Sequence, residues 1–181
     1  MKKKLLQKFI DIYGNDNDAK VYFAPGRVNL IGEHIDYSGG RVLPCALTLG
    51  TYAVASKRAD DKLRFYSMNF PDSGIVEGSI REYKVEDEKD WTNYLKGVMW
   101  AFEERGMKLT SGIDFLIYGD LPGGAGLSSS ASLEVLTGLV LRDLFGFALS
   151  NEEIAILGQR AENVFCGVNC GIMDQLSLIH I

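Results

Sequence analysis

Residues 121–132, Leu-Pro-Gly-Gly-Ala-Gly-Leu-Ser-Ser-Ser-Ala-Ser, decide how this chain is interpreted. They follow a strand-like run at residues 112–118 and precede a helical pattern from about residue 130 to 144. The three glycines allow positive φ angles and a close approach of the backbone to a ligand. Successive N–H groups at the start of a helix, at the positive end of its dipole, attract an anion. We therefore predict a phosphate-binding loop between a strand and a helix.

The loop differs from two familiar nucleotide-binding motifs. It lacks the Gly-Lys-Ser/Thr of a Walker A loop, and serines stand where a Rossmann fingerprint has its third glycine. A plain Gly/Ser turn with a serine N-cap is the alternative interpretation. A cap needs one serine, whereas three serines follow three glycines in this loop, so phosphate binding is the stronger interpretation.

A second polar segment lies much earlier in the chain. Residues 24–40 read Ala-Pro-Gly-Arg-Val-Asn-Leu-Ile-Gly-Glu-His-Ile-Asp-Tyr-Ser-Gly-Gly, and we expect a loop from Pro25 to Gly40 after a short strand at 21–23. Carboxylates and a histidine suit the recognition of neighbouring hydroxyls. An arginine can neutralise the charge of a transferring phosphoryl group. A salt-bridged surface loop is the alternative, but five clustered polar groups among glycines favour a functional site.

The remaining pattern predicts strands mainly in the first half of the chain and helices in the second, which indicates an α+β fold with a mixed sheet. Asp60-Asp61 between two β-forming runs suggests a hairpin. Ser150 and Glu153 have the spacing of a capping box at the start of a helix. Expected helices are 3–13, with Leu5, Phe9 and Ile10 on one face, 91–105, 130–144 and 150–165, and expected strands are 49–57, 62–68, 75–85 and 112–118.

Composition narrows the function classes. The 181 residues carry a net charge of −5, so no basic face for a nucleic acid is expected. The sequence has no membrane span and no signal-peptide pattern, which predicts a cytoplasmic protein without a membrane partner. The three cysteines do not suggest a disulfide framework, and for Cys166 and Cys170, four residues apart, buried reduced thiols are a better interpretation than a metal pair. With only His34 and His180, a Ser-His-Asp or Cys-His mechanism is disfavoured.

Both polar segments resemble motifs of known kinases. Residues 26–37, Gly-Arg-Val-Asn-Leu-Ile-Gly-Glu-His-Ile-Asp-Tyr, resemble the galactokinase signature along its full length, with Ile35 where many members have threonine. Residues 121–132 resemble the second motif of the wider GHMP kinases (galactokinase, homoserine kinase, mevalonate kinase and phosphomevalonate kinase). The resemblance runs from about residue 19 to Gln175 and implies the N-terminal lobe of that fold, in which helices pack on a mixed sheet. The fold is of the same class as the second domain of a small-subunit ribosomal protein.

The resemblance implies roles that the residue pattern alone does not give. On pattern alone, Asp174 would be a cap and Glu162 a solvated helix residue. The resemblance implies catalytic roles for Asp174 and Arg27, ATP and Mg²⁺ as cofactors, and Ser130 and Glu162 as the Mg²⁺ ligands. It implies sugar contacts from Glu33, His34, Ile35, Asp36, Gly171 and Asp174. It implies ATP contacts from Ser67, Trp91, Tyr94, Gly124, Ala125, Gly126, Leu127, Ser128, Ser129 and Ser130.

The implied activity is transfer of a phosphoryl group from ATP to the C1 hydroxyl of galactose. One alternative is an N-acetylgalactosamine kinase, which shares both motifs and would need a pocket enlarged around the C2 substituent. Another is a non-catalytic galactose sensor that binds a transcriptional regulator, although such relatives lose part of the serine-rich loop, which is intact here at residues 126–132. We expect the complete protein to be a monomer.

The end of the chain departs from the resemblance. The relatives are roughly twice as long, so residues 1–175 are expected to form an N-terminal domain whose C-terminal lobe is missing. Residues 176–181, Leu-Ser-Leu-Ile-His-Ile, match the translation of a transposase adapter used in DNA library preparation. We therefore expect a non-native tail over these six residues.

Overall fold

The computed structural model describes residues 1–15, 18–32, 34–85, 90–122 and 124–179. Its strands form one five-stranded sheet in the order β1-β2-β5-β3-β4, antiparallel except for the parallel pair β3–β5. The strands are β1 (Lys20–Ile31), β2 (Leu43–Lys57), β3 (Lys62–Ser67), β4 (Ile75–Ser79) and β5 (Ile113–Gly119). The predicted α+β class and mixed sheet are therefore confirmed.

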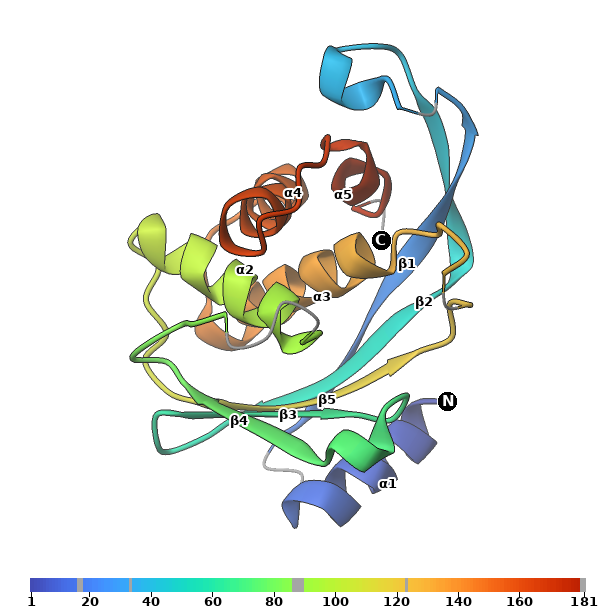
Figure 1. The fold of residues 1–181 in the computed structure, drawn as a ribbon. Helices are drawn as coiled ribbons and strands as arrows, with labels where there is room; N and C mark the ends of the chain where they lie inside the picture. The colour runs from blue at the N-terminus through green and yellow to red at the C-terminus, as the bar shows by residue number, and fades with distance from the viewer. Residues whose placement is uncertain (16–17, 33, 86–89, 123, 180–181) are drawn as a thin grey trace.

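Helices cover both faces of the sheet (Figure 1). The helices are α1 (Lys2–Tyr13), α2 (Thr92–Glu104), α3 (Ser129–Phe145), α4 (Asn151–Arg160) and α5 (Met173–Ser177), with short 3-10 helices η1 (Asp36–Ser38) and η2 (Pro71–Ser73) and one π-helical turn, η3 (Ala161–Phe165). Four helices, α2 to α5, lie on one face over the main core, whereas α1 packs alone on the other face. None of the helices in the described residues is long and apolar enough to cross a membrane.

The expected helices all form, and local chemistry explains their ends. Ser150 and Glu153 make both hydrogen bonds of the predicted capping box at the start of α4. Gly14 and Gly146 end α1 and α3 in the left-handed conformation that glycine adopts without a steric penalty. On α1 the predicted Leu5 and Phe9 are buried together with Tyr13, at intervals of four residues, whereas Ile10 is half-buried. The Tyr13 hydroxyl donates to the Phe115 carbonyl (2.7 Å).

The predicted hairpin around Asp60-Asp61 is wrong. The chain does turn there, but β5 lies between β2 and β3, pairing antiparallel with the first and parallel with the second. Residues 113–117 are buried, as expected for a central strand with helices on both faces. The strand predicted at 75–85 is shorter than expected and ends at Ser79.

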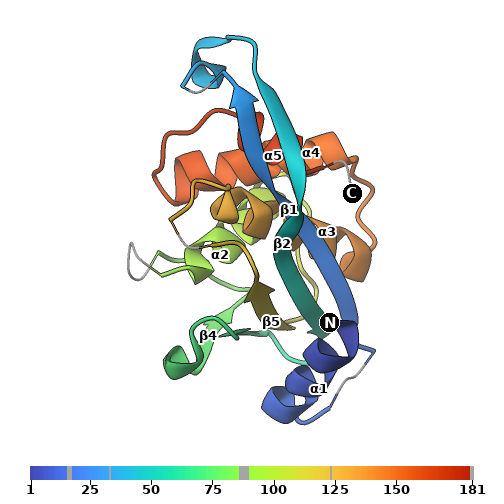
Figure 2. The same cartoon turned by 90° about the vertical axis from the view of Figure 1, so that its right-hand side faces the viewer.

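The predicted loop from Pro25 to Gly40 is also wrong over its first part. Residues 25–31 continue β1 and pair with β2, with register shifts at Pro25/Arg27 and Asn29/Ile31 that absorb the proline and glycine. We call residues 25–32 and 34–50 the arm, and its outer part rises beyond the helices as a two-stranded projection (Figure 2). Its tip carries η1 and stands apart from the core, so the polar segment is presented on a strand pair rather than on a free loop.

The last described residues pack into the main core. Leu178 and Ile179 are buried, and the Asn151 side chain donates to the Ile179 carbonyl (2.8 Å). The proposed non-native origin of residues 176–181 stays a prediction, and sequencing the gene beyond codon 175 tests it. A normal reading frame that continues through the same six codons would reject it.

Candidate active site

The predicted phosphate loop forms the turn between β5 and α3. Gly124 and Gly126 have positive φ angles of 70° and 65°, as expected for the glycines of an anion-binding turn. Residues 124–126 are exposed, and Ser129 begins α3. Gly123 lies outside the described residues. The loop therefore presents its backbone to solvent at the N-terminal end of a 17-residue helix.

The loop packs tightly against the base of the arm at Gly26. A Cβ atom on Gly26 would lie 2.5 Å from Leu121 Cδ2 and 2.8 Å from the Leu127 carbonyl oxygen. The next residue, Arg27, donates its backbone N–H to the same carbonyl (3.2 Å). Glycine is required at position 26 because the two motifs, about 100 residues apart in sequence, touch backbone to backbone there.

Arg27 and Asp174 form an ion pair beside the loop. The Arg27 Nε and Nη2 atoms donate to Asp174 Oδ1 at 2.9 and 2.7 Å, and Nη1 donates to the Gly126 carbonyl. The Ser128 hydroxyl donates to the second carboxylate oxygen, Oδ2, at 2.5 Å. The fold thus brings both predicted catalytic residues together against the phosphate loop. We call Gly26, Arg27, Gly126, Leu127, Ser128 and Asp174 the loop junction.

Two neighbouring cavities flank Ser129 and Ser130. The smaller, about 260 Å³, lies over the phosphate loop and is lined by the predicted residues Gly124 to Ser130, Arg27 and Asp174. The larger, about 590 Å³, is more apolar and contains the predicted Ser67, Trp91 and Tyr94. Their shared wall at Ser129 and Ser130 makes one continuous surface of the size and polarity that a nucleotide requires.

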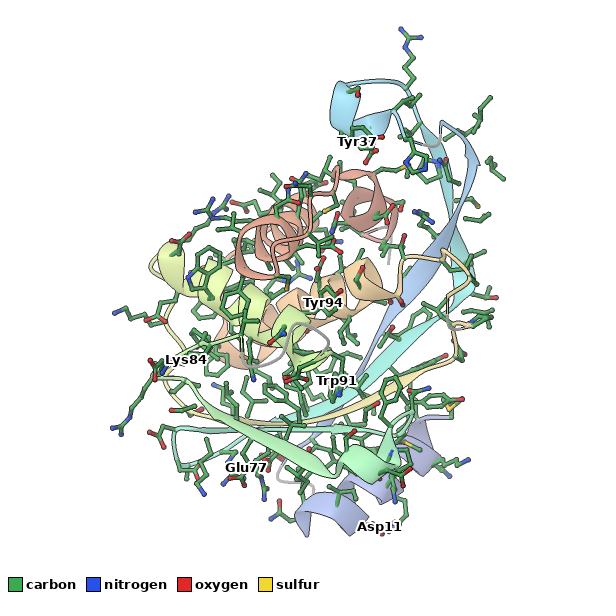
Figure 3. The ribbon with its side chains drawn as sticks, in the orientation of Figure 1. Asp11, Tyr37, Glu77, Lys84, Trp91 and Tyr94 are labelled. Atoms are coloured by element: carbon green, nitrogen blue, oxygen red, sulfur yellow. The ribbon has the colours of Figure 1, made fainter. Side chains whose placement is uncertain are left out.

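Trp91 and Tyr94 come from the start of α2, and Figure 3 shows them well away from Tyr37 on the arm. Leu121 of the predicted phosphate loop also lines this larger cavity, and its lining residues that the sequence did not predict are Thr51, Asn69, Phe70, Ile117, Gly119 and Leu133. Asn69 is fixed by a reciprocal pair of hydrogen bonds with the Gly119 backbone, both 2.8 Å. Of these residues, only Asn69 and Phe70 could have been suggested by the sequence, because they directly follow the predicted strand 62–68.

Of the predicted sugar-binding residues, His34, Ile35 and Asp36 lie at the arm tip, and Asp36 reaches Gly171 in the segment before Asp174. A Cβ atom on Gly171 would lie 1.8 Å from Asp36 Oδ2, so the carboxylate rests directly on the Gly171 backbone. His34 and Ile35 are exposed, and His34 has a positive φ of 59°. Glu33 lies outside the described residues. Among the described members of this set, the fold brings together Asp36 and Gly171.

The two predicted metal ligands occupy different environments. Ser130 lines both cavities, whereas Glu162 lies in the π-helical turn with 6% of its surface exposed, so it is not a solvated helix residue. Glu162 Oε2 accepts hydrogen bonds from Gln175 Nε2 (2.9 Å) and from the Cys170 thiol. No group of three or more His, Cys, Asp or Glu side chains in the described residues has the geometry of a metal site.

A second buried acid, Glu134, accompanies Glu162. Gln175 Nε2 also donates to Glu134 Oε2 (2.8 Å), and Glu134 Oε1 has no hydrogen-bond partner among the described residues. Burial and the neighbouring Glu162 raise the pKa of Glu134 well above its usual value. Hydroxyl and carboxylate oxygens suit a hard divalent cation, and buried acidic groups without a cation would be stabilised by one nearby. By residue type, Ser130 and Glu162 would suit Mg²⁺, although they lie in different surroundings in the described structure.

The sequence matches two family models over most of its length. Residues 7–57 match the galactokinase galactose-binding signature, and residues 93–180 match the GHMP kinases N terminal domain. The chain is 49% identical over 177 residues to a galactokinase of Ligilactobacillus salivarius, covering 98% of this chain and 46% of the relative. It is 51% identical over 172 residues to one of Clostridium acetobutylicum, covering 95% of this chain and 44% of the relative.

Solved structures agree with these matches. The crystal structure of Lactococcus lactis galactokinase complexed with galactose superposes with a TM-score of 0.94 at 43% identity, covering 97% of this chain and 45% of that one. A Methanococcus jannaschii mevalonate kinase, 22% identical over 89% of this chain and 51% of its own, shares the fold with a TM-score of 0.74. The chain spans somewhat less than half the length of the curated relatives it matches. By both motifs, both family models and this superposition, the chain belongs to the galactokinase family of the GHMP kinases.

Proposed function

We propose that the protein of which this chain forms the N-terminal region phosphorylates galactose with ATP, giving galactose 1-phosphate and ADP. The observation that supports this most is the loop junction. Arg27, Ser128 and Asp174 meet at the phosphate loop, beside a nucleotide-sized cavity. Phosphoryl transfer depends mainly on positioning and on neutralisation of charge, and the junction offers a cation, an acceptor-side carboxylate and backbone donors within one contact network.

In the proposed reaction, the C1 hydroxyl oxygen of galactose forms a bond to the γ-phosphorus of ATP. The bond between that phosphorus and the β–γ bridging oxygen breaks, and ADP leaves. The C1 hydroxyl proton passes to the Asp174 carboxylate, which is placed at the wall of the phosphate cavity. Arg27 stabilises the negative charge of the transferring group and holds the carboxylate through Oδ1.

The nucleotide is proposed to lie across both cavities. Its base would occupy the larger one, where Trp91 and Tyr94 offer aromatic faces and Ser67 a polar contact. Its phosphates would meet the backbone of Gly124 to Ser130. Ser130 and Glu162 would hold Mg²⁺, which neutralises phosphate charge when bound.

The sugar is proposed to bind between the arm tip and Asp174. Glu33, His34, Ile35, Asp36 and the Gly171 backbone would contact its hydroxyls, and the contact between Asp36 and Gly171 supports this placement. We assign the protein to the cytoplasm and expect a monomer. The three free thiols, Cys45, Cys166 and Cys170, fit a reducing compartment.

The test requires a complete kinase. We define the completed kinase as residues 1–175 followed by the C-terminal half of the Lactococcus lactis enzyme, whose N-terminal half this chain matches closely. ADP release should depend on galactose in the completed kinase, whereas the 181-residue chain alone should be nearly inactive. Robust galactose-dependent ADP release by the chain alone would contradict the second expectation.

The same assay separates the alternatives. Faster turnover of N-acetylgalactosamine than of galactose would favour the acetylated sugar as substrate. Galactose binding by calorimetry without ADP release would favour a sensor and would reject the proposed enzyme. An intact Ser128-Ser129-Ser130 sequence at the helix start supports the enzyme, since this is the part that phosphate binding needs.

A further inference from the structure

Ser128 combines two unusual features within the loop junction. Its φ angle is 57°, in the left-handed region, where only three non-glycine residues of the described chain have a positive φ. Its side chain does not cap α3, although Ser128 stands at the N-cap position. A serine at an N-cap ordinarily bonds the helix backbone, so the residue forgoes the usual interaction and adopts a strained backbone.

The hydroxyl of Ser128 is instead used on Asp174. It donates to Oδ2 at 2.5 Å, and the residue is 8% exposed. The other carboxylate oxygen, Oδ1, accepts both hydrogen bonds from Arg27. Each oxygen therefore has its own donor, from two segments far apart in sequence, and the carboxylate plane is fixed against rotation. Hydrogen bonds to a charged group are about twice as strong as neutral ones.

The backbone conformation explains why the contact forms. The left-handed turn at Ser128 places its carbonyl as the first acceptor of α3, where it accepts from Ser132 N–H (2.9 Å). The preceding carbonyl, of Leu127, accepts from the Arg27 N–H. Leu127 and Ser128, two consecutive residues of the phosphate loop, thus hydrogen-bond to the base of the arm and to the Asp174 carboxylate.

We propose that Ser128 is a positioning residue that holds the Asp174 carboxylate toward the sugar hydroxyl that accepts the phosphoryl group. Its side chain acts through Asp174 rather than by donating a hydrogen bond to the phosphates of ATP. This inference rests on the proposed function. Because Ser128 belongs to the phosphate loop, the loop conformation that receives the nucleotide also sets the orientation of the carboxylate that receives the proton.

The kinetic test uses Ser128→Ala and Ser128→Gly in the completed kinase. Both variants lose the hydroxyl, but only glycine relieves the positive φ. We expect kcat to fall about tenfold to a hundredfold in both variants, as for loss of a hydrogen bond to a charged group, with the KM for ATP within about twofold. The exposed Ser73→Ala variant serves as the control and should be unchanged. A raised KM for ATP with kcat unchanged, or a loss confined to Ser128→Ala, would overturn the proposal.

A second measurement needs no activity and uses the 181-residue chain itself. In a double-mutant cycle, the effect of Ser128→Ala on Tm should be smaller by about 4 °C or more in an Asp174→Ala background, which offers no side-chain acceptor to the Ser128 hydroxyl. Additive shifts would overturn the contact on which the inference depends. If the unmutated completed kinase is inactive, the proposed function fails, while the cycle still decides whether Ser128 and Asp174 are coupled.

Discussion

The polar segment at residues 24–40 is divided between the loop junction, which contains Arg27, and the arm tip. The two regions differ in how many hydrogen bonds within the chain fix their polar side chains. At the junction, Arg27 and Ser128 hold both oxygens of Asp174. On the arm, His34 and Ile35 are exposed, and both amide atoms of the Asn29 side chain are shielded from solvent without a hydrogen-bond partner in the described structure. The half proposed for catalysis and nucleotide binding is thus preorganised by its own hydrogen bonds, whereas the half proposed to bind the sugar is more exposed.

The largest expected effect compares a carboxylate from each region in the completed kinase. Asp174→Asn should lower kcat by about a thousandfold, because an amide cannot accept the proton that the proposed reaction releases. Asp36→Asn should mainly raise the KM for galactose, about tenfold, since it would lose only binding contacts. Initial rates of ADP release at varied galactose concentrations distinguish the two patterns. Unchanged turnover in Asp174→Asn would reject its assigned role.

A second prediction compares Gly26, where the base of the arm contacts the phosphate loop, with Gly171, where the Asp36 side chain of the arm tip contacts the segment before Asp174. Gly26→Ala should destabilise the 181-residue chain by about 1–3 kcal/mol, because its Cβ would lie 2.8 Å from a backbone oxygen that cannot move aside cheaply. Gly171→Ala should cost about 0.5 kcal/mol or less, although its Cβ would lie only 1.8 Å from Asp36 Oδ2, because that carboxylate can rotate away on the exposed arm.

Urea unfolding followed by circular dichroism measures both changes. Equal losses would mean that the arm tip is held as firmly as the junction, which contradicts the comparison. In the completed kinase, Gly171→Ala should instead appear as weaker galactose binding, since the displaced Asp36 carboxylate belongs to the proposed sugar site.

The comparison also explains what could be predicted from the sequence. The phosphate loop was predicted on physical grounds, because glycine conformations and a helix start are local properties. The pairing of Arg27 with Asp174, 147 residues apart, followed only from the family resemblance. The insertion of β5 between β2 and β3 could not be predicted, because the turn at Asp60-Asp61 is compatible with either neighbour.

The arm and the buried acids were missed for different reasons. Pro25 and Gly26 usually end a strand, and only pairing with β2 through register shifts lets β1 continue past them. Glu134 looks like an ordinary helix residue in sequence, yet it is fully buried because α3 is covered on several sides. Neither the continuation of β1 nor the burial of Glu134 can be predicted from the local pattern of residues, because both depend on contacts with distant parts of the chain.

The last expected effect, a gain in stability, concerns Glu134, a buried acid near Asp174 that is not fully paired in the described structure. Within the part of the chain that the structure describes, Glu134 Oε1 and Gln175 Oε1 lack hydrogen-bond partners, although the two side chains already share one hydrogen bond. Glu134→Gln would add an amide donor and remove a buried acid, so we expect the variant to be more stable at neutral pH by about 1 kcal/mol, or about 2–4 °C in Tm.

The stability gained by Glu134→Gln should increase as the pH rises. The folded pKa of Glu134 is raised by burial and by Glu162, so above the usual pKa of a glutamate the folded chain binds more protons than the unfolded chain. Stability of the unmutated chain therefore falls as pH rises through this range, whereas the Glu134→Gln variant escapes that loss. The difference in Tm should be smallest near pH 4 and should widen toward pH 8, measured with EDTA present to remove divalent cations. The exposed Glu77→Gln variant serves as the control and should show no such trend. If the difference in Tm between Glu134→Gln and the unmutated chain instead narrows with rising pH, Glu134 is a stabilising carboxylate, paired as fully as Asp174 is at the loop junction.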